Sequence, residues 1–307
     1  MALLEVNKLS VSFIQYTSGL RQHEVQTIRD LSLSIHAGEI VAVFGSSGSG
    51  KSLLAHAILG ILPENARMSG TIHYDGNLLD AYRLLALRGK EIALVPQSVN
   101  YLDPLMKVGA QVRSTAVGSD PVAVQRSIFK RYRLKDHVDN LYPFQLSGGM
   151  ARRVLVATAA VSDARLIIAD EPTPGMHSDD VAEALHTFKE MADNGSAVLF
   201  ITHDIEAALR IADRVVVLYA GTTFEIAAAE DFMGNGERLR HPYTKALWQA
   251  LPQNEFKPNL GVQPQPNNLP TGCLFAPRCA SSTQACKESR PEMRDLRAGS
   301  VRCIHAS

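Results

Sequence analysis

Residues 45–52 have the sequence Gly-Ser-Ser-Gly-Ser-Gly-Lys-Ser, which fits the phosphate-binding pattern G-x-x-x-x-G-K-[ST]. An apolar run at 39–44 precedes it and a helical apolar pattern at 53–59 follows, which is the strand–loop–helix context that the motif requires. Glycines let the backbone curl around an anion, while the loop N–H groups and the helix N-terminus form a cradle. A Gly/Ser-rich linker is the alternative, but a linker has no need of Gly-Lys-Ser after an apolar strand. The chain is therefore predicted to bind a nucleoside triphosphate through Gly45, Ser46, Ser47, Gly48, Ser49, Gly50, Lys51 and Ser52.

Two carboxylates stand where they could complete a magnesium site. Asp170 and Glu171 end the apolar run at 166–170. In a phosphate-loop fold the first acid holds the hydration shell of Mg²⁺ and the second can polarise the attacking water. The Lys51 ammonium is expected to reach the β- and γ-phosphates, and the Ser52 hydroxyl to bind the metal. Two surface acids at a strand end are common, but downstream of a phosphate loop they are predicted to be functional.

A second group of backbone donors lies between these motifs. Ser147, Gly148 and Gly149 open a helical run at 153–159. A Ser-Gly-Gly sequence at the positive end of a helix dipole suits a second phosphate contact. Taken alone, it could equally be an ordinary helix N-cap.

The pattern of apolar residues predicts an α/β fold around these motifs. Residues 3–14 and 25–36 alternate as antiparallel strands do. Residues 103–146 look mostly helical, and Leu62-Pro63 is predicted to end the helix that follows the phosphate loop. Further strands alternate with helices, which favours a parallel sheet. These strands are expected at 91–95, 166–170 and 197–202, with a long helix at 179–193.

Composition excludes several classes of protein. Lysine plus arginine number 31 and aspartate plus glutamate also 31, so no nucleic acid partner is expected. The longest apolar stretches, such as 215–220, are too short to cross a bilayer. The first residues lack the features of a signal peptide. We therefore expect a cytosolic protein that reaches a membrane only through partners.

All four cysteines follow a proline-rich linker at 258–270. The C-terminal segment is too short to form its own core and is expected to need a staple. Structural disulfides are rare in the cytosol, so metal ligation is the natural alternative. The close cysteine pairs of zinc sites are absent, and the spacing fits neither common ferredoxin pattern. Zinc, an iron–sulfur cluster and unligated thiols all stay open for Cys273, Cys279, Cys286 and Cys303.

Five motifs in a fixed order resemble those of the ATP-binding subunits of ABC transporters, over about residues 3–250. They are the loop 45–52, Gln97 after a strand, and the segments 146–150, 170–173 and 201–204. More narrowly, the chain resembles the oligopeptide/dipeptide/nickel importers through Met150 and the segments 241–244 and 272–279.

The resemblance implies a P-loop ABC ATPase domain at 1–253, in which a mixed, largely parallel core sheet is joined by an antiparallel β subdomain and a helical subdomain at 98–152. Residues 254–307 would form a linker and a small cysteine-rich extension. ATP and Mg²⁺ are the implied cofactors, together with a [4Fe–4S] cluster on the four cysteines.

The resemblance also implies site residues. Ser52, Gln97 and Asp170 would surround Mg²⁺, and Glu171 would be the general base. His203 would contact the γ-phosphate, so the implied catalytic residues are Glu171, His203 and Gln97. Phe13 lies where family members stack an aromatic ring on adenine, and Tyr16 is close enough in sequence to be the alternative.

The implied partners follow from how such domains pair. ATP would lie between this chain's phosphate loop and the Ser-Gly-Gly of another ATPase, while Ser147, Gly148 and Gly149 would act on the partner's nucleotide. Two permease subunits, and indirectly an extracytoplasmic binding protein, would complete an importer at the cytoplasmic face of the inner membrane. Its cargo would be peptides, nickel or a metal chelate.

Two positions depart from the family pattern, both on elements that this chain would lend to its partner. The family usually has Gln or a similar residue before Arg153, where this chain has Arg152. After Thr173 the family usually continues with two small residues, Leu and Asp. This chain has Pro174, Gly175, Met176 and His177 at these four positions, so His177 replaces the aspartate. Such departures suit a heterodimer of two different ATPases with unequal sites.

Two other functions fit the sequence less well than transport. ABC ATPases of DNA repair or chromosome architecture insert long coiled coils between phosphate loop and signature, and this chain has no heptads there. A non-catalytic regulatory subunit is disfavoured because Glu171 and His203 are intact.

Overall fold

The computed structural model describes residues 1–16, 21–259 and 261–307. Its centre is an eight-stranded sheet in the order β11-β12-β10-β9-β3-β8-β7-β6. The five strands from β9 to β6 pair in parallel, which confirms the sheet type predicted from the sequence. The bounds are β3 (Ile40–Gly45), β6 (Ile92–Val95), β7 (Leu166–Asp170), β8 (Ala197–Thr202) and β9 (Arg214–Tyr219).

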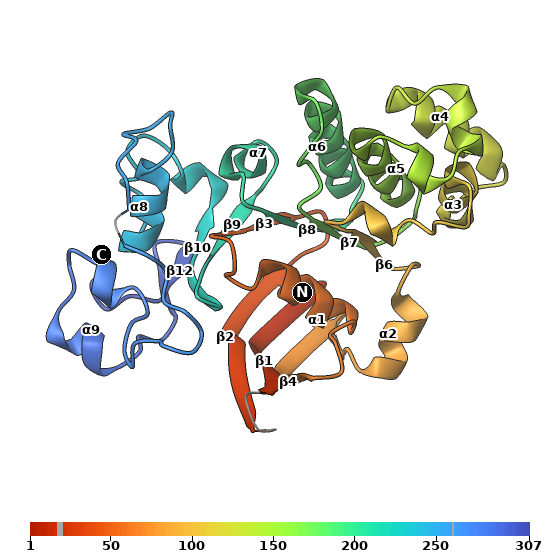
Figure 1. Cartoon of the computed structure of the whole chain (residues 1–307). Coiled ribbons are helices and arrows are strands. Elements are labelled where there is room, and N and C mark those ends of the chain that lie inside the picture. Colours follow the sequence, from red (N-terminus) through yellow and green to blue (C-terminus); the bar gives the residue numbers. More distant parts are fainter. Residues whose placement is uncertain (17–20, 260) are drawn as a thin grey trace.

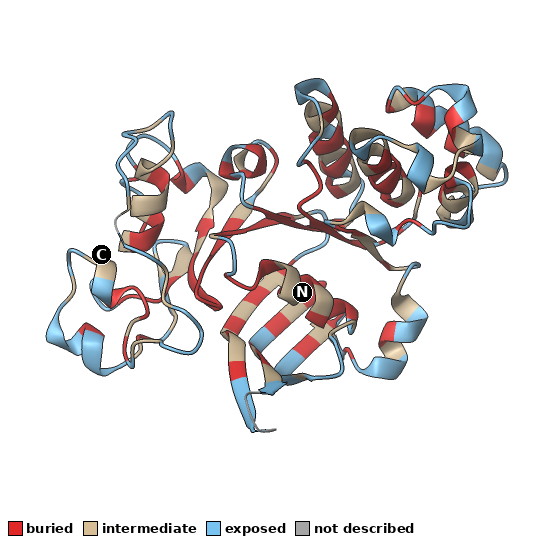
Figure 2. Ribbon diagram, in the orientation of Figure 1, coloured by how far each residue is buried: buried red, intermediate tan, exposed pale blue. Residues whose placement is uncertain are grey.

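A second, antiparallel sheet forms the predicted β subdomain. Its order is β2-β1-β4-β5, from β1 (Leu4–Tyr16), β2 (Gln22–Ile35), β4 (Ala66–Tyr74) and β5 (Asn77–Leu78). Helix α1 (Lys51–Leu59) lies between the two sheets, and its apolar side chains share one core with strands of both. The two buried layers are visible as red bands on the strands in Figure 2.

Helix α1 ends earlier than expected. Gly60, in the left-handed region with φ 61°, caps it and donates its N–H to the carbonyl of Ala57. A glycine takes this backbone conformation without the steric cost of a Cβ, so it stops the helix before Leu62-Pro63.

The opposite face of the core sheet is covered by helices, and Figure 1 shows the helical subdomain beyond β6. The helical character predicted for 103–146 is confirmed there. The α-helices are α2 (Ala81–Leu87), α3 (Val108–Thr115), α4 (Pro121–Arg131), α5 (Gly148–Ala160), α6 (Ser178–Asp193), α7 (Ile205–Leu209), α8 (Pro242–Gln249) and α9 (Gln284–Glu288). Short 3₁₀ turns lie at 99–101, 136–140, 143–145, 229–231 and 276–278. Among the described residues, no helix is both long and apolar enough to span a membrane.

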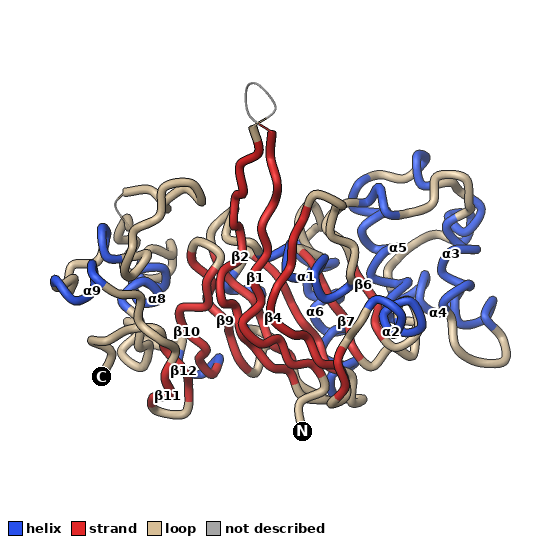
Figure 3. The backbone as a smooth tube through the Cα atoms, turned by 90° about the horizontal axis from the view of Figure 1, so that it is seen from below, coloured by secondary structure: helices blue, strands red, loops and turns tan. Residues whose placement is uncertain are grey.

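The C-terminal segment is joined to the core sheet. Strand β10 (Thr222–Ala228) pairs with β12 (Gly299–Val301), which in turn pairs with β11 (Arg294–Leu296). Figure 3 shows these strands beside β9, on the side away from the helical subdomain. The domain boundary near residue 253 stays a prediction, but the cysteines are not the only attachment of the tail.

A buried ionic network holds this junction. The Arg240 guanidinium lies 2.8 Å from Asp231 and 3.4 Å from Glu225, and Glu225 is fully buried. Glu225 also accepts the backbone N–H groups of Arg240 and His241, both at 2.8 Å. Arg240 donates in turn to the carbonyl of Leu296, in the hairpin β11–β12. The Arg240 side chain thus connects Glu225 of β10 to the hairpin of the tail, and Glu225 also binds the backbone at the start of α8.

We expect Arg240→Ala to lower the free energy of unfolding by about 3–5 kcal/mol, because it leaves the buried Glu225 without its cation and Asp231 with only the exposed Arg238. The matched control is Arg133→Ala, since Arg133 pairs with Asp179 at the surface with both side chains more than half exposed. That change should cost at most about 1 kcal/mol. Urea denaturation measures both, and equal losses would show that the buried network does not anchor the tail.

Candidate nucleotide site and the cysteine cavity

The phosphate loop begins where β3 ends. A Cβ on Gly45 would lie 2.6 Å from the Leu218 carbonyl and 2.7 Å from Ser49 Oγ, so only glycine fits. Gly48 and Gly50 have φ of 76° and 94°, in the region that favours glycine. The loop then enters α1, whose N-cap Gly50 has no side chain to satisfy the first N–H groups of the helix. These donors and the helix dipole form an anion cradle.

Lys51 folds back over this loop. Its Nζ donates to the carbonyls of Gly45 at 2.7 Å and Ser46 at 3.2 Å. Burial lowers the pKa of Lys51, and the charges of Glu171 and Asp170 oppose that shift. A buried ammonium that contacts only neutral carbonyls is a ready partner for an anion such as phosphate.

Ser52 and Asp170 meet although 118 positions separate them in sequence. The Ser52 hydroxyl donates to Asp170 Oδ1 at 3.1 Å. Burial raises the pKa of Asp170, which the hydrogen bond from Ser52 opposes. A hydroxyl and a carboxylate are the oxygen donors that Mg²⁺ takes from protein alongside substrate phosphates, so the donor set fits this ion.

Glu171 and His203 form the other side of the site. Glu171 is 6% exposed, and its Oε2 lies 2.8 Å from His203 Nδ1. An ionised carboxylate only accepts, so Nδ1 carries the hydrogen in this contact and Nε2 is left as the second bonding atom of the ring.

One cavity of about 540 Å³ brings most of the predicted residues together. It is lined by the loop residues Ser47, Gly48, Gly50, Lys51 and Ser52, by Leu53, and by Thr27, Gln97, Glu171 and His203. Phe13 does not line it; its ring is half-buried against the core of the antiparallel sheet. Tyr16 is 66% exposed and bonds to Gln22. The aromatic contact to adenine stays a prediction for both.

The Ser147 segment lies outside this cavity. Ser147 caps α5 by accepting the N–H of Met150 at 3.3 Å, and both Ser147 and Gly148 are exposed. His177, at the N-cap of α6, is also exposed. The surface-facing position leaves these residues open to a second chain.

Two contacts at the site were not predicted from the sequence. Arg152 donates to the carbonyls of Gln97 and Glu171, at 2.6 and 3.1 Å. Gln263, in the proline-rich linker, accepts from the Ser46 hydroxyl of the phosphate loop at 2.5 Å. The unusual arginine was visible as a departure from the family pattern, but no local signal could place the linker against the loop.

The four cysteines converge on one small cavity, together with His241. Burial raises the pKa of Cys273 and Cys279, and the neighbouring thiols of Cys303 and Cys286 raise it further. In the described ranges, no three His, Cys, Asp or Glu side chains are arranged to hold a single metal ion.

His241 brings a polar atom to this cavity. Burial lowers its pKa to about 3, so the ring is neutral. Nδ1 accepts the N–H of Tyr243 at 2.9 Å, which places the ring hydrogen on Nε2. Nε2 is buried and makes no hydrogen bond of normal geometry within the described residues, while the Arg302 backbone lies near enough to raise the pKa against the effect of burial.

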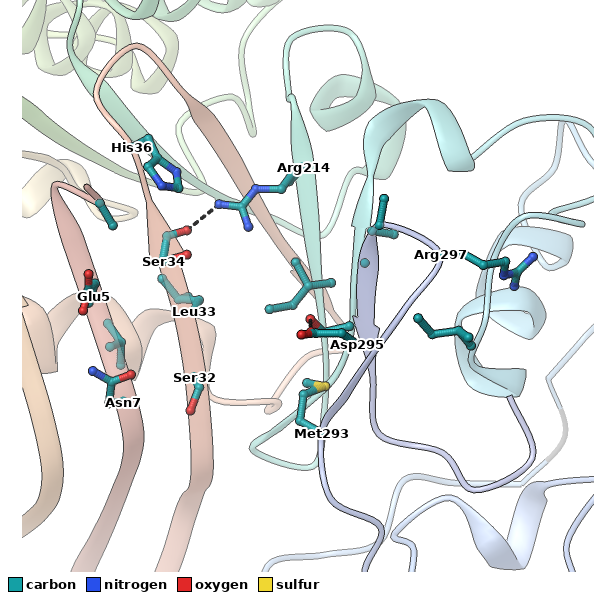
Figure 4. A pocket seen from close by; sticks show the side chains of 18 residues that line it. Glu5, Asn7, Ser32, Leu33, Ser34, His36, Arg214, Met293, Asp295 and Arg297 are labelled. Carbon is teal, nitrogen blue, oxygen red and sulfur yellow. Dashed lines mark hydrogen bonds between the residues drawn. The ribbon is translucent and has the colours of Figure 1, made fainter. Parts of the chain in front are cut away.

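A larger cavity lies elsewhere in the described part of the chain. It measures about 900 Å³ between β1 and β2 on one side and the β11–β12 hairpin on the other. In Figure 4, Glu5 and Ser32 lie on one wall and Asp295 on the other, and Arg214 donates to the Ser34 carbonyl at 2.8 Å. It contains none of the predicted site residues, so size does not identify the site here.

Gly45→Ala is predicted to weaken ATP binding by this chain. The new Cβ would displace the start of the loop, at a cost of about 1–3 kcal/mol, which is roughly a 5- to 150-fold loss of affinity. Gly148→Ala is the control, because a Cβ there meets nothing within 4 Å. Equilibrium binding of a fluorescent ATP analogue measures both, and unchanged affinity in Gly45→Ala would contradict the tight fit.

Comparison with known proteins agrees with this geometry. The family model for ABC transporters matches residues 28–174, and that for the C-terminal region of oligopeptide/dipeptide transporters matches 224–286. The oligopeptide transport ATP-binding protein OppD of Salmonella typhimurium is 32% identical, covering 94% of this chain and 89% of that protein. The dipeptide transport ATP-binding protein DppD of Haemophilus influenzae is 31% identical, covering 99% and 95%.

Solved structures show the same fold. One of them is a dimeric ATP-binding cassette in a post-hydrolysis state, bound to ADP and Pi. It matches this chain with a TM-score of 0.63 and 25% sequence identity, and the match covers 74% of this chain and 98% of the cassette chain. The predicted P-loop ABC ATPase fold is thereby confirmed. The chain belongs to the family of ABC transporter ATP-binding proteins, among those that share the oligopeptide/dipeptide transporter C-terminal region.

Proposed function

We propose that this chain hydrolyses ATP, with Mg²⁺, to power the import of oligopeptides or dipeptides. The observation that carries the proposal is the convergence of Lys51, Ser52, Glu171 and His203 on one cavity, with Asp170 hydrogen-bonded to Ser52 and Glu171 to His203. The named relatives are peptide transport proteins, and nothing in the site favours nickel or a metal chelate as cargo.

The proposed roles follow from charge and position. The loop N–H groups and Lys51 bind the phosphates, while Ser52 and Asp170, with Gln97 at the rim, hold Mg²⁺, which when bound neutralises charge on the phosphates. Glu171, buried and next to the loop, accepts the proton of the attacking water. His203 holds the Glu171 carboxylate in position and contacts the γ-phosphate.

A second ATPase completes each site in this proposal. The signature residues Ser147, Gly148 and Gly149 cannot serve this chain's own loop, because they lie outside its cavity, and Ser147 and Gly148 are exposed. A head-to-tail pair would place them on the partner's nucleotide. Since His177 departs from the family pattern on the exposed surface that would face the partner, we propose a different chain as partner and two unequal sites.

Membrane association is proposed to come through permease subunits. Directly after Gln97, the side chains of Tyr101 and Leu105 are 54% and 87% exposed. Apolar groups in this position would be covered by a permease, linking the site to transport. The protein would then sit peripherally at the cytoplasmic face of the inner membrane, and an extracytoplasmic binding protein would choose the cargo.

Glu171→Gln is predicted to keep ATP binding and to lower kcat of the assembled transporter by about 100- to 10,000-fold, since it removes the base but no metal ligand. Peptide uptake into proteoliposomes and phosphate release measure the loss. Lys51→Ala is the contrasting variant, because it should weaken nucleotide binding itself. Normal turnover in Glu171→Gln would refute the assignment of the base.

We further propose that the cysteine cavity holds a [4Fe–4S] cluster. Support comes from the four thiols around one cavity and from the buried Nε2–H of His241, a hydrogen-bond donor suited to sulfur acceptors. Four Cys thiolates are the usual ligands of such a cluster. Its role would be structural, because no residue of the hydrolytic site lies in the tail.

Protein purified without oxygen should be brown and contain iron and acid-labile sulfide. Cys286→Ser should lose the colour and loosen the tail, while ATP affinity at Lys51 changes little, because the nucleotide cavity shares no residue with the cysteines. Metal analysis decides the matter: a colourless protein with stoichiometric zinc would replace the cluster by a zinc site.

A further inference from the structure

Glu171 has a strained backbone. Its φ is 48°, in the left-handed region that residues other than glycine rarely adopt. The next residue is Pro172, and a residue before proline is normally restricted to extended conformations. Such a conformation persists only where the surroundings hold it, and it is common at functional sites.

The peptide groups on both sides of Glu171 are held. Its N–H donates to the Ile201 carbonyl of β8 at 2.8 Å. Its own carbonyl accepts from Arg152 Nη1 at 3.1 Å. The first bond belongs to the sheet register, whereas the second comes from a side chain on another element, α5.

Arg152 also fixes the segment that contains Gln97. The same Nη1 atom donates to the carbonyls of Gln97 at 2.6 Å and Pro96 at 3.3 Å. Charge-assisted bonds of this kind are stronger than bonds between neutral groups. Arg152 Nη1 therefore links the ends of β6 and β7 to helix α5, which Ser147 caps.

Arg152 differs in this respect from its neighbour. Arg153 donates to the carbonyls of Gly149 and Tyr132 and lies 3.6 Å from Asp180, all within the helical region. Of these two arginines, Arg152 is the one that contacts carbonyls beside the nucleotide cavity. Burial lowers the pKa of its guanidinium, and the charges of Glu171 and Asp170 oppose that shift.

We propose that Arg152 is a positioning residue for hydrolysis: it holds the strained Glu171 peptide and the Gln97 segment in the geometry that the reaction needs. Without it, the Glu171–Pro172 peptide can relax and swing the carboxylate away from the attacking water. Nucleotide affinity rests on the loop and Lys51, which Arg152 does not touch. The inference depends on Glu171 as the base, which the Glu171→Gln variant tests separately.

The decisive variants replace the single donating nitrogen in graded ways. Arg152→Lys retains one cationic nitrogen with three N–H donors, enough for the three carbonyls. Arg152→Gln offers a neutral, shorter amide, and Arg152→Ala offers nothing. Arg165→Ala is the matched control, because Arg165 stands at the other end of β7 and pairs with Asp75.

In the assembled transporter we expect Arg152→Ala and Arg152→Gln to lower kcat by about 10- to 100-fold, as a small misplacement of a catalytic group does. The KM for ATP should stay within about twofold, since ground-state binding is retained. Arg152→Lys should recover most of the loss, and Arg165→Ala should match the wild type.

Three results would overturn the inference. Wild-type kcat in Arg152→Gln would show that the charged contact is dispensable. If Arg152→Ala, Arg152→Gln and Arg152→Lys all raise the KM for ATP and lower the thermal unfolding midpoint together, Arg152 acts in folding alone. If Glu171→Gln retains turnover, the base itself is misassigned. If Glu171→Gln loses turnover but the Arg152 variants retain it, the positioning role fails while the proposed base stands.

Discussion

The parallel pairing of β3, β7 and β8 is the constraint on which the site depends. Parallel strands end at the same edge of a sheet, so the phosphate loop after β3, the carboxylates after β7 and His203 after β8 must meet. The buried registers leave no freedom to slip, because every residue of these strands is buried on both faces. Backbone N–H groups and the buried Lys51 ammonium can stabilise negative charge at this edge. Glu171 is held there in a left-handed backbone conformation that a glutamate rarely adopts.

The same edge joins the site to the rest of the molecule. Arg152 links it to the helical subdomain, and Gln263 brings the linker onto Ser46 of the loop. Tyr219, the last residue of the neighbouring strand β9, packs against Phe275 of the cysteine segment. The tail is thus mechanically connected to the nucleotide site although its residues do no chemistry there.

The tail itself combines two kinds of attachment. Pairing of β12 with β10 and the buried Arg240 network fix the hairpin to the core sheet. The cysteines and His241 gather beside α8, around one small cavity. Ligation there would add stability to a segment with few apolar side chains of its own.

Local chemistry could be predicted from the chain alone: a phosphate loop, a strand ending in two acids and apolar periods of two or about 3.6 residues depend on neighbours in sequence. For this reason the loop 45–52, Asp170 and Glu171 could be proposed as site residues, and the predicted strand–helix alternation is confirmed. Long-range geometry could not be predicted. Nothing near Arg152 indicates three carbonyls from β6 and β7, nothing near Gln263 indicates Ser46, and nothing near Cys303 indicates that β12 joins the main sheet. These contacts depend on how sheets and helices pack across the whole fold, and only the tertiary structure brings such distant atoms within bonding distance.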